Sequence, residues 1–261
     1  MSAKLGVRGL GFAYENRQIL RDISFDVQEG ELVALLGPSG CGKSTILNLI
    51  AGLISPQAGS IWVDGRQISG RSERFAYMPQ DDLLFPWLTV LKNVCLYGRL
   101  HGTQVQARRR ALERMPAFGL AGCENLYPSA LSGGMRQRAA FLRTSLCNAD
   151  ILLLDEPFGA LDVISRGDMQ DWLLAMRGEW GKTALLVTHD IDEALYLSDR
   201  ILVLGCSPAG VAGVFEVKRK IRTREWLYAQ SEMRAQIYRC IKSHQALWRA
   251  EEPCAGAKGA G

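Results

Sequence analysis

The chain has 261 residues, of which 48% are hydrophobic and 22% are charged, and its formal net charge is +4 at pH 7. This ordinary globular composition suits one large α/β domain or two small ones and excludes a chain that is disordered throughout. The positive excess is too small to indicate a nucleic-acid partner, and we expect none.

Cysteine usage and apolar segments indicate where the protein works. The seven cysteines are scattered through the sequence without a C-x-x-C pair. This pattern predicts neither a zinc site nor a disulfide framework, and it fits a reducing cytosol. No segment reaches the roughly 18 apolar residues that a spanning helix needs, so we expect a chain that is neither exported nor membrane-spanning on its own.

Two patterns of apolar residues divide the chain. Alternation predicts an early antiparallel region with strands at residues 5–14, 22–28, 31–37 and 61–65. Helical spacing then predicts a helical insert at residues 87–124. From Ile151 onward the sequence predicts a strand at 151–155, a helix at 163–180, a strand at 183–188, a helix at 191–197 and a strand at 200–205. Such alternation is typical of buried parallel strands joined by crossover helices, which predicts an α/β fold.

A glycine-rich segment follows the apolar residues 32–36 and opens a helical pattern. It matches G-x-x-x-x-G-K-[ST], the phosphate loop in which backbone N–H groups surround the phosphates of a nucleotide. Its lysine adds a positive charge there, and its serine hydroxyl can ligate Mg²⁺. The alternative, a turn between a strand and a helix, would explain the glycines. It would not explain why Lys and Ser directly follow the last glycine of the motif. We therefore predict that ATP is bound by Gly37, Pro38, Ser39, Gly40, Cys41, Gly42, Lys43, Ser44 and Thr45.

Two carboxylates, Asp155 and Glu156, follow the apolar run ILLL. Open α/β sheets place their ligand chemistry at the carboxyl ends of parallel strands. Asp155 is predicted to hold Mg²⁺, directly or through water. Glu156 points elsewhere and is predicted to polarise the water that attacks ATP. Two solvated acids at a strand end are the alternative, and the phosphate loop argues against it.

The segment Leu131-Ser132-Gly133-Gly134-Met135 resembles LSGGQ, the signature of ABC-transporter ATPases, with Met135 in place of glutamine. Ser132, Gly133 and Gly134 at a helix N-terminus form a second anion site. In this family the second site completes the ATP pocket of the opposing subunit. The resemblance therefore implies an ATP hydrolase that works with Mg²⁺ as a head-to-tail dimer of two copies with two shared nucleotides.

The resemblance extends from Leu5 to about Phe215 and implies four further roles. Tyr14 is implied to stack on adenine, although a tyrosine of an edge strand would look the same in sequence. Gln80 is implied to reach Mg²⁺ and the attacking water and to sense membrane subunits. His189 is implied to contact the γ-phosphate. Asp162 is implied to lie in a loop at the dimer interface, where it would also serve as a helix N-cap.

The resemblance also implies the domain organisation. Residues 1–220 are expected to form the ATPase cassette, a P-loop NTPase core of mixed, largely parallel sheet. An N-terminal antiparallel β subdomain and a helical signature-motif subdomain at about 87–147 complete it. Residues 221–261 are expected to form a C-terminal helical extension with a flexible tail.

A basic cluster and an amphipathic helix are predicted near the C-terminus. The helix carries Met233, Ile237, Ile241 and Trp248 on one side. A solvated basic face is favoured over proximity to anionic lipid headgroups. The cluster consists of Lys218, Arg219, Lys220, Arg222 and Arg224.

The stretch from Tyr77 to Val90 resembles ATPases of the nitrate, sulfonate and taurine importers, a group that includes carriers of pyrimidine precursors of thiamine. Phe85 and Lys92 depart from that pattern, because leucine and aspartate are common there. The resemblance implies a peripheral subunit on the cytoplasmic face of the membrane that energises integral-membrane permease subunits. An extracytoplasmic binding protein would supply the solute, whose identity stays open within this group.

A docking groove for a short cytoplasmic helix of the permease is expected beside Gln80. Leu84, Phe85, Pro86 and Trp87 are apolar residues in a loop, which is costly to expose unless a partner covers them. The alternative is that they pack on the insert's own helices, and each explanation can hold for different residues.

Two other functions stay open. An exporter ATPase is usually fused to or encoded with its membrane part, and the Pro86-Trp87 region argues against it. A soluble ABC ATPase that acts on DNA or ribosomes predicts a long coiled-coil insertion or two tandem cassettes, and the sequence shows neither.

Overall fold

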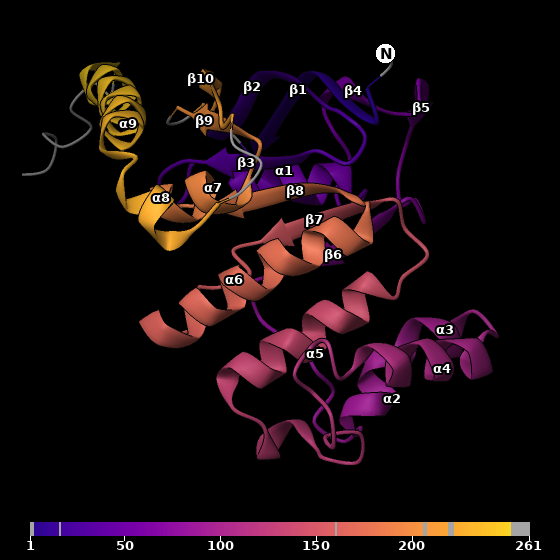
Figure 1. The fold of residues 1–261 in the computed structure, drawn as a ribbon. Coiled ribbons are helices and arrows are strands. Elements are labelled where there is room, and N and C mark those ends of the chain that lie inside the picture. Colours follow the sequence, from indigo (N-terminus) through magenta and orange to yellow (C-terminus); the bar gives the residue numbers. More distant parts are fainter. Residues whose placement is uncertain (1–2, 16, 160, 206–207, 219–221, 252–261) are drawn as a thin grey trace, which may run out of the picture.

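Two β-sheets with helices between and beside them make up the part of the chain that the structure describes (Figure 1). The structure is a computed structural model that describes residues 3–15, 17–159, 161–205, 208–218 and 222–251. The first sheet is antiparallel and contains β1 (Leu5–Tyr14), β2 (Arg17–Val27), β4 (Ala58–Val63) and β5 (Arg66–Ile68). Its strand order is β2-β1-β4-β5, so β1 is an internal strand.

The second sheet is mostly parallel. Its strands are β3 (Leu32–Leu36), β6 (Phe75–Met78), β7 (Ile151–Asp155), β8 (Thr183–Thr188), β9 (Arg200–Leu204) and β10 (Val211–Glu216). Their order is β10-β9-β3-β8-β7-β6, with β10 antiparallel to β9. The prediction that residues 31–37 belong to the antiparallel region is therefore wrong. All five residues of β3 are buried, because a central parallel strand is covered on both faces.

The second sheet separates two hydrophobic cores. Val33 and Leu35 of β3 face α1 (Lys43–Ile50) and the antiparallel sheet. Ala34 and Leu36 face the opposite layer, which contains α5 (Gly133–Ser145), α6 (Val163–Trp180) and α7 (Ile191–Leu197). The helices α6 and α7 have the predicted bounds. The predicted α/β fold with a mixed sheet, an antiparallel β region and a helical region is confirmed.

The helical insert lies beside α5, away from the antiparallel sheet (Figure 1). It contains α2 (Val90–Val94), α3 (Leu96–Leu100) and α4 (Gln104–Arg114), and the 3-10 turn η1 (Pro128–Ala130) follows it. The fully buried amide of Asn93 holds the preceding loop, because it accepts from the N–H of Phe85 at 2.7 Å and donates to the Leu88 carbonyl at 3.0 Å. Leu84 joins the core, whereas Trp87 is 69% exposed. Packing within the protein thus accounts for Leu84, and a partner that covers Trp87 stays a prediction.

The C-terminal helices α8 (Arg224–Tyr228) and α9 (Ser231–Glu251) pack against α7, β9 and β10. Ile237 is fully buried, and Met233 and Ile241 pack against the core, as the predicted apolar side requires. The side chain of Trp248 and the predicted flexible tail at 252–261 lie outside the described part. Within the described residues, none of the helices combines the length and the apolar character needed to cross a bilayer.

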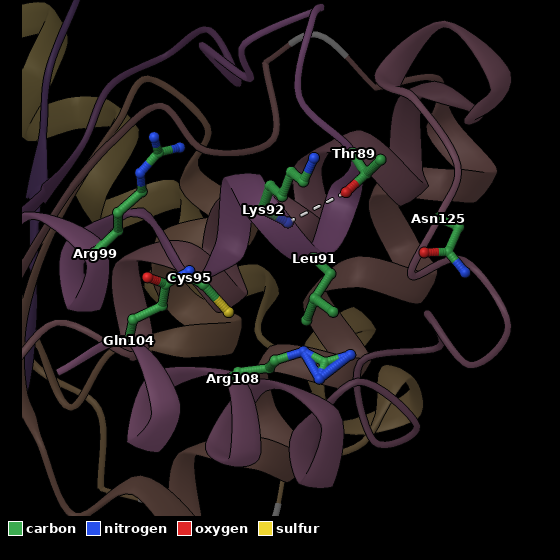
Figure 2. Close-up of a pocket in the computed structure, with 8 residues that line it drawn as sticks. All are labelled: Thr89, Leu91, Lys92, Cys95, Arg99, Gln104, Arg108 and Asn125. Carbon is green, nitrogen blue, oxygen red and sulfur yellow. Dashed lines mark hydrogen bonds between the residues drawn. The ribbon is translucent and has the colours of Figure 1, made fainter.

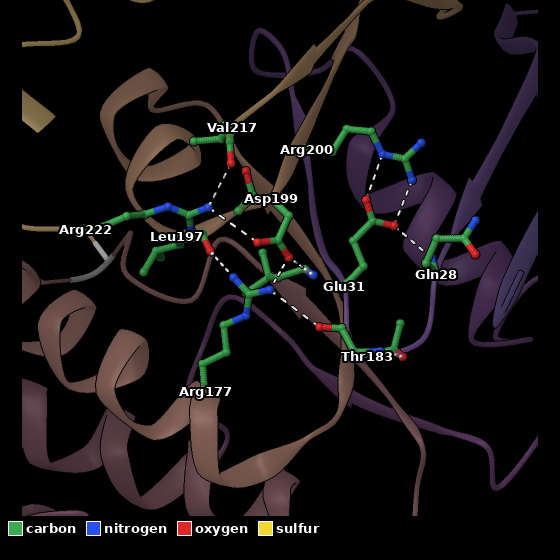
Figure 3. Close-up of polar contacts among 12 residues, drawn as sticks. Gln28, Glu31, Arg177, Thr183, Leu197, Asp199, Arg200, Val217 and Arg222 are labelled. Atoms are coloured by element: carbon green, nitrogen blue, oxygen red, sulfur yellow. Dashed lines mark hydrogen bonds and ion pairs between the residues drawn. The ribbon is translucent and has the colours of Figure 1, made fainter. Parts of the chain in front are cut away.

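The predicted solvated basic face is wrong for two residues of the basic cluster. Arg222 is 8% exposed and donates to a carboxylate oxygen of Asp199 at 3.4 Å, beside Arg177 of α6 (Figure 3). Arg224 lies 4.3 Å over the Tyr196 ring and pairs with Asp171 of α6 at 2.8 Å. Both guanidinium groups therefore fix the C-terminal segment to α6 and α7. Lys218 is exposed, and Arg219 and Lys220 lie outside the described residues.

Candidate active site

The loop between β3 and α1 has the geometry of a phosphate cradle. A Cβ added to Gly37 would lie 2.8 Å from Sγ of the buried Cys41, so a larger residue does not fit there. Gly42 has a φ of 99°, in the left-handed region that favours glycine. Lys43 is 4% exposed, and its ammonium group donates to the carbonyls of Gly37 and Pro38 at 2.8 Å each. The loop thus holds a buried cation at the N-terminus of α1, where an anion is stabilised.

Three oxygen-bearing side chains lie together at this loop. The hydroxyl of Ser44 donates to one oxygen of Asp155 at 2.9 Å, and the hydroxyl of Tyr77 donates to the other at 3.0 Å. Burial raises the pKa of Asp155, although both hydrogen bonds oppose the shift. A hard cation would offset this loss of hydration, and Mg²⁺ prefers such oxygen donors. Sequence reasoning missed Tyr77, whose place in the short strand β6 gave no sign of this contact.

Glu156 brings three parts of the chain together. One carboxylate oxygen lies 3.0 Å from Nδ1 of His189, and the other lies 3.9 Å from the ammonium nitrogen of Lys43. Gln80, in the loop after β6, lies near the Glu156 side chain. Both side chains flank Gly159, because a Cβ added to Gly159 would lie 3.6 Å from Nε2 of Gln80 and 3.8 Å from a carboxylate oxygen of Glu156.

The backbone at Glu156 is strained, because its φ is 43°. A residue other than glycine in this region costs of order 1–3 kcal/mol, and such strain concentrates at active sites. The backbone N–H of Glu156 donates to the carbonyl of Val187 at 3.0 Å, and its carbonyl accepts from Gly159 at 3.0 Å. These bonds fix the carboxylate beyond the end of β7.

The second predicted anion site lies at the N-terminus of α5. Ser132 is its N-cap, and the hydroxyl accepts from the N–H of Met135 at 3.2 Å. Ser132 and Gly133 are exposed, and a Cβ on Gly134 would lie 3.8 Å from the Cβ of Ser165. The helices α1 and α5 pack on opposite faces of the second sheet (Figure 1). The two N-termini therefore belong to different layers of one chain.

Asp162 begins α6 beside this second site. Its carboxylate accepts from the N–H groups of Ile164 and Ser165 at 3.1 Å each, so the predicted helix N-cap is present. The hydrogen bond from the side chain of Ser165, followed by those from the backbone, holds the pKa of Asp162 below its usual value. Since Ser165 also lies against Gly134, the N-termini of α5 and α6 are in contact.

Comparisons with known proteins identify the family. A model of the ABC transporter family matches residues 20–159, more than half of the chain. The chain belongs to the ABC transporter family. It is an ABC-type ATPase, and ATP is its nucleotide.

Three similar proteins give the family assignment its detail. The formylaminopyrimidine import ATP-binding protein of Halalkalibacterium halodurans is 42% identical over 91% of this chain and 96% of its own length. An aliphatic sulfonates import ATP-binding protein of Rhodococcus jostii is 50% identical over 77% of this chain and 78% of its own. A dimeric ATP-binding cassette in a post-hydrolysis state, bound to ADP and Pi, has a TM-score of 0.70 and 29% identity over 82% of this chain and 99% of its own.

Two arginines connect α5, the helix that begins at the signature motif of this ABC ATPase, to the loop that follows Gln80. Arg136 pairs with Asp82 at 3.1 Å, and Arg143 donates to the backbone carbonyls of Asp82 and Leu83 at 2.6 and 2.7 Å. Leu83 is held at a φ of 45°. Sequence reasoning missed these contacts because their partners lie more than 50 residues apart.

Tyr14 lies at the end of β1 with half of its surface exposed. It makes an edge-to-face contact with Phe12, at 4.8 Å between ring centroids. At Tyr14 the strand pairs only with β2, because the pairing of β1 with β4 ends at Gly11, so the edge-strand alternative is not contradicted. Adenine stacking stays a prediction.

Removing the loop cation tests the phosphate cradle. We expect Lys43→Ala to weaken ATP binding roughly tenfold to a hundredfold, because a hydrogen bond to a charged group contributes about 1.5–3 kcal/mol. Turnover should be lost as well. Titration with a fluorescent ATP analogue and a phosphate-release assay measure the two effects. Lys218→Ala, at an 83% exposed lysine, is the control. Unchanged affinity and turnover in Lys43→Ala would contradict the phosphate-loop assignment.

A buried acid supports the turn that carries His189. The hydroxyl of Thr188 donates to Glu193, and it accepts from the N–H of Asp190 at 3.0 Å. Glu193 is 6% exposed, and burial raises its pKa to about 8. Sequence reasoning did not single out Glu193, because its role depends on this enclosure.

The raised pKa of Glu193 predicts a pH-dependent stability. The folded protein keeps this proton to about pH 8, whereas the unfolded chain loses it near 4.5. The contribution of protonated Glu193 to the free energy of unfolding is therefore fully present below about pH 4.5. It falls by up to about 1.4 kcal/mol per pH unit as the pH rises from about 4.5 to about 8. Relative to Glu193→Gln, the wild type should lose stability from pH 5.5 to 7.5 in urea titrations. An equal pH dependence of stability in the wild type and in Glu193→Gln would contradict this prediction. Glu29→Gln, at an exposed glutamate, is the control.

Proposed function

We propose that this chain is the ATP-hydrolysing, energy-coupling subunit of an ABC importer for a small solute. The convergence of Lys43, Glu156, His189 and Gln80 at the carboxyl edge of the parallel strands supports the hydrolytic part of the proposal. The import names of the similar proteins support its direction of transport. Sulfonates and pyrimidine precursors of thiamine are accordingly the proposed solute classes, with nitrate and taurine retained from the sequence resemblance.

We assign the reaction roles as follows. Lys43 and the N–H groups of the phosphate loop bind the phosphates of ATP. Glu156 accepts a proton from the attacking water, while His189 and Gln80 orient the water and the γ-phosphate. The hydrogen bond between Glu156 and His189 holds the carboxylate in place for this role. Tyr14 contributes the adenine contact.

The Mg²⁺ site is proposed at Ser44, Asp155 and Gln80. The contact between the Ser44 hydroxyl and Asp155 supports it, because both oxygens suit a hard cation. When bound, Mg²⁺ neutralises the charge that develops on the phosphate oxygens. Tyr77 orients the Asp155 carboxylate toward Ser44.

Two copies of the chain are proposed to share two ATP molecules head to tail. The separation of α1 and α5 on opposite faces of the sheet supports this, because Ser132, Gly133 and Gly134 are exposed or partly exposed at a distance from their own phosphate loop. The dimeric cassette with ADP and Pi supports it as well. Asp162 is proposed to lie at this interface.

We place the dimer on the cytoplasmic face of the membrane, beneath permease subunits that receive solute from an extracytoplasmic binding protein. The exposed Leu83 and Trp87 in the loop after Gln80 support a permease contact there. Residues 1–220 are proposed as the cassette and 221–261 as its extension, although α8 and α9 share the cassette's core.

Uptake of labelled solute by cells that express the complete transporter tests the function. ATP-dependent accumulation of a sulfonate or pyrimidine, lost with Lys43→Ala, is the expected result. Export of the label would favour an exporter ATPase. Failure of any multi-spanning protein to co-purify with the chain would favour a soluble ABC ATPase.

A further inference from the structure

One guanidinium group joins the loop of Gln80 to the signature turn of the same chain. Nε of Arg136 donates to a carboxylate oxygen of Asp82 at 3.1 Å, and Nη1 donates to the carbonyl of Leu131 at 3.2 Å. Asp82 stands two residues after Gln80, and Leu131 directly precedes Ser132. Hydrogen bonds between charged groups are about twice as strong as neutral ones. Arg136 therefore links the neighbours of two functional residues.

The position of Gln80 depends on this link, because the loop around it is short. β6 ends at Met78, and both the side chain and the backbone carbonyl of Asp82 accept hydrogen bonds from α5. Only residues 79–81 lie between these two fixed points. Loss of the side-chain contact at Asp82 would therefore loosen Gln80, and a shift of α5 relative to the sheet would move it.

The same turn of α5 also contacts the segment that follows Glu156. Gln137 is 4% exposed, and its side-chain amide donates to the carbonyl of Pro157. Neighbouring positions of one helix thus hold the loop of Gln80 and the turn after Glu156, whose side chains both flank Gly159. Because secondary elements move as rigid units, a displacement of the signature end of α5 reaches both groups.

A hollow of about 340 Å³ brings the same segments face to face. Arg136 forms part of its wall, together with Asp82 of the loop, Gly133 of the signature and Leu161. Leu161 directly precedes Asp162, and a Cβ added to Gly133 would lie 3.9 Å from Cδ2 of Leu161. Three segments that the proposed dimer uses at its two nucleotides therefore meet at this guanidinium group.

We propose that Arg136 is a positioning residue that couples the two ATP sites of the dimer. It joins Gln80, which serves the chain's own ATP, to Ser132, which serves the ATP held by the partner. A nucleotide bound at the signature turn then fixes Gln80 through the contact with Asp82. This inference rests on the proposed function and adds a route by which one site responds to the other.

Mixed dimers separate the two halves of this role. One chain carries Ser132→Arg and the other carries Lys43→Ala, so that the dimer keeps one complete site. The first chain supplies Gln80 and Glu156 to that site, and the second chain supplies Ser132. Arg136→Gln is then introduced into either chain, because glutamine removes the charge and shortens the side chain. Two different affinity tags isolate the mixed dimer.

We expect Arg136→Gln to lower phosphate release of the mixed dimer roughly threefold to tenfold in either chain, as loss of a partly exposed charged contact does. In the first chain the substitution releases Gln80, and in the second it loosens the turn at Ser132. Asp82→Asn keeps the size of the side chain and should match this loss only in the first chain. Added to Arg136→Gln in that chain, it should cause no further loss.

Two further measurements exclude a merely structural effect. Binding of a fluorescent ATP analogue to the single chain should not change in Arg136→Gln, since the phosphate loop lies outside these contacts. Turnover of the wild-type dimer should rise cooperatively with ATP concentration, and the Hill coefficient of Arg136→Gln should fall toward 1. Arg108→Gln, at an exposed arginine that lines a hollow of the helical insert (Figure 2), is the matched control.

A loss of turnover with Arg136→Gln in only one of the two chains, or in neither, would overturn the inference and leave the proposed function standing. Equal Hill coefficients of the wild type and Arg136→Gln would overturn it as well. If the mixed dimer without Arg136→Gln released no more phosphate than the sum of its two parent variants, the proposed shared site would fail, and the inference with it.

Discussion

Replacing Glu156 with glutamine is expected to lower ATP turnover about 10³-fold and to leave ATP binding intact, because a positioned general base contributes typically 10²–10⁴-fold. Glutamine keeps the size of the side chain but cannot accept the proton of the attacking water. The variant should therefore bind two ATP molecules and remain in the dimeric state. Size-exclusion chromatography with ATP and Mg²⁺ would show a stable dimer, and phosphate release would show the loss of turnover.

The contacts of Glu156 make this substitution a sharp test. Its carboxylate lies between Lys43 and His189, and an amide in the same place keeps one hydrogen-bonding oxygen. Exposed Glu29→Gln controls for the loss of a negative charge. A Glu156→Gln variant that hydrolysed ATP at the wild-type rate would show that another group acts as the base.

The sequence predicted the parts of this site that depend on local order. The phosphate loop and Asp155-Glu156 were recognisable because each follows an apolar strand and bears residues that serve no packing purpose. The bounds of α6 and α7 were predicted from the sequence pattern, and Asp162 and Asp190 cap these two helices in the structure. These features are encoded within a few consecutive residues.

The remaining features depend on distant partners and were not predictable in the same way. Tyr77 lies 78 residues before Asp155, and Arg143 lies 60 residues after Leu83. Arg222 looked like part of a solvated cluster until the structure placed Asp199 beside it. Residues 31–37 were predicted in the wrong sheet, since an apolar run indicates a strand without identifying its neighbours.

Ser132→Arg is expected to leave ATP binding by the single chain nearly unchanged and to abolish the ATP-dependent dimer. Ser132 is exposed at the N-terminus of α5, far in the fold from its own Lys43, so a bulky side chain there does not obstruct the chain's own phosphate loop. It would instead occupy the space through which the partner's nucleotide reaches the helix N-terminus. Ser132→Ala should have a smaller effect, since loss of a cap costs about 1 kcal/mol.

Mixing two inactive variants gives the strongest test of the shared site. In a two-fold symmetric dimer, a chain with Ser132→Arg can still offer its intact Lys43 to the intact Ser132 of a chain with Lys43→Ala. One composite site of such a mixed dimer is complete, and the other carries both defects. The mixture should therefore hydrolyse ATP faster than the sum of the two variants measured separately. Turnover equal to that sum, or normal turnover of Ser132→Arg alone, would mean that each chain completes its own site.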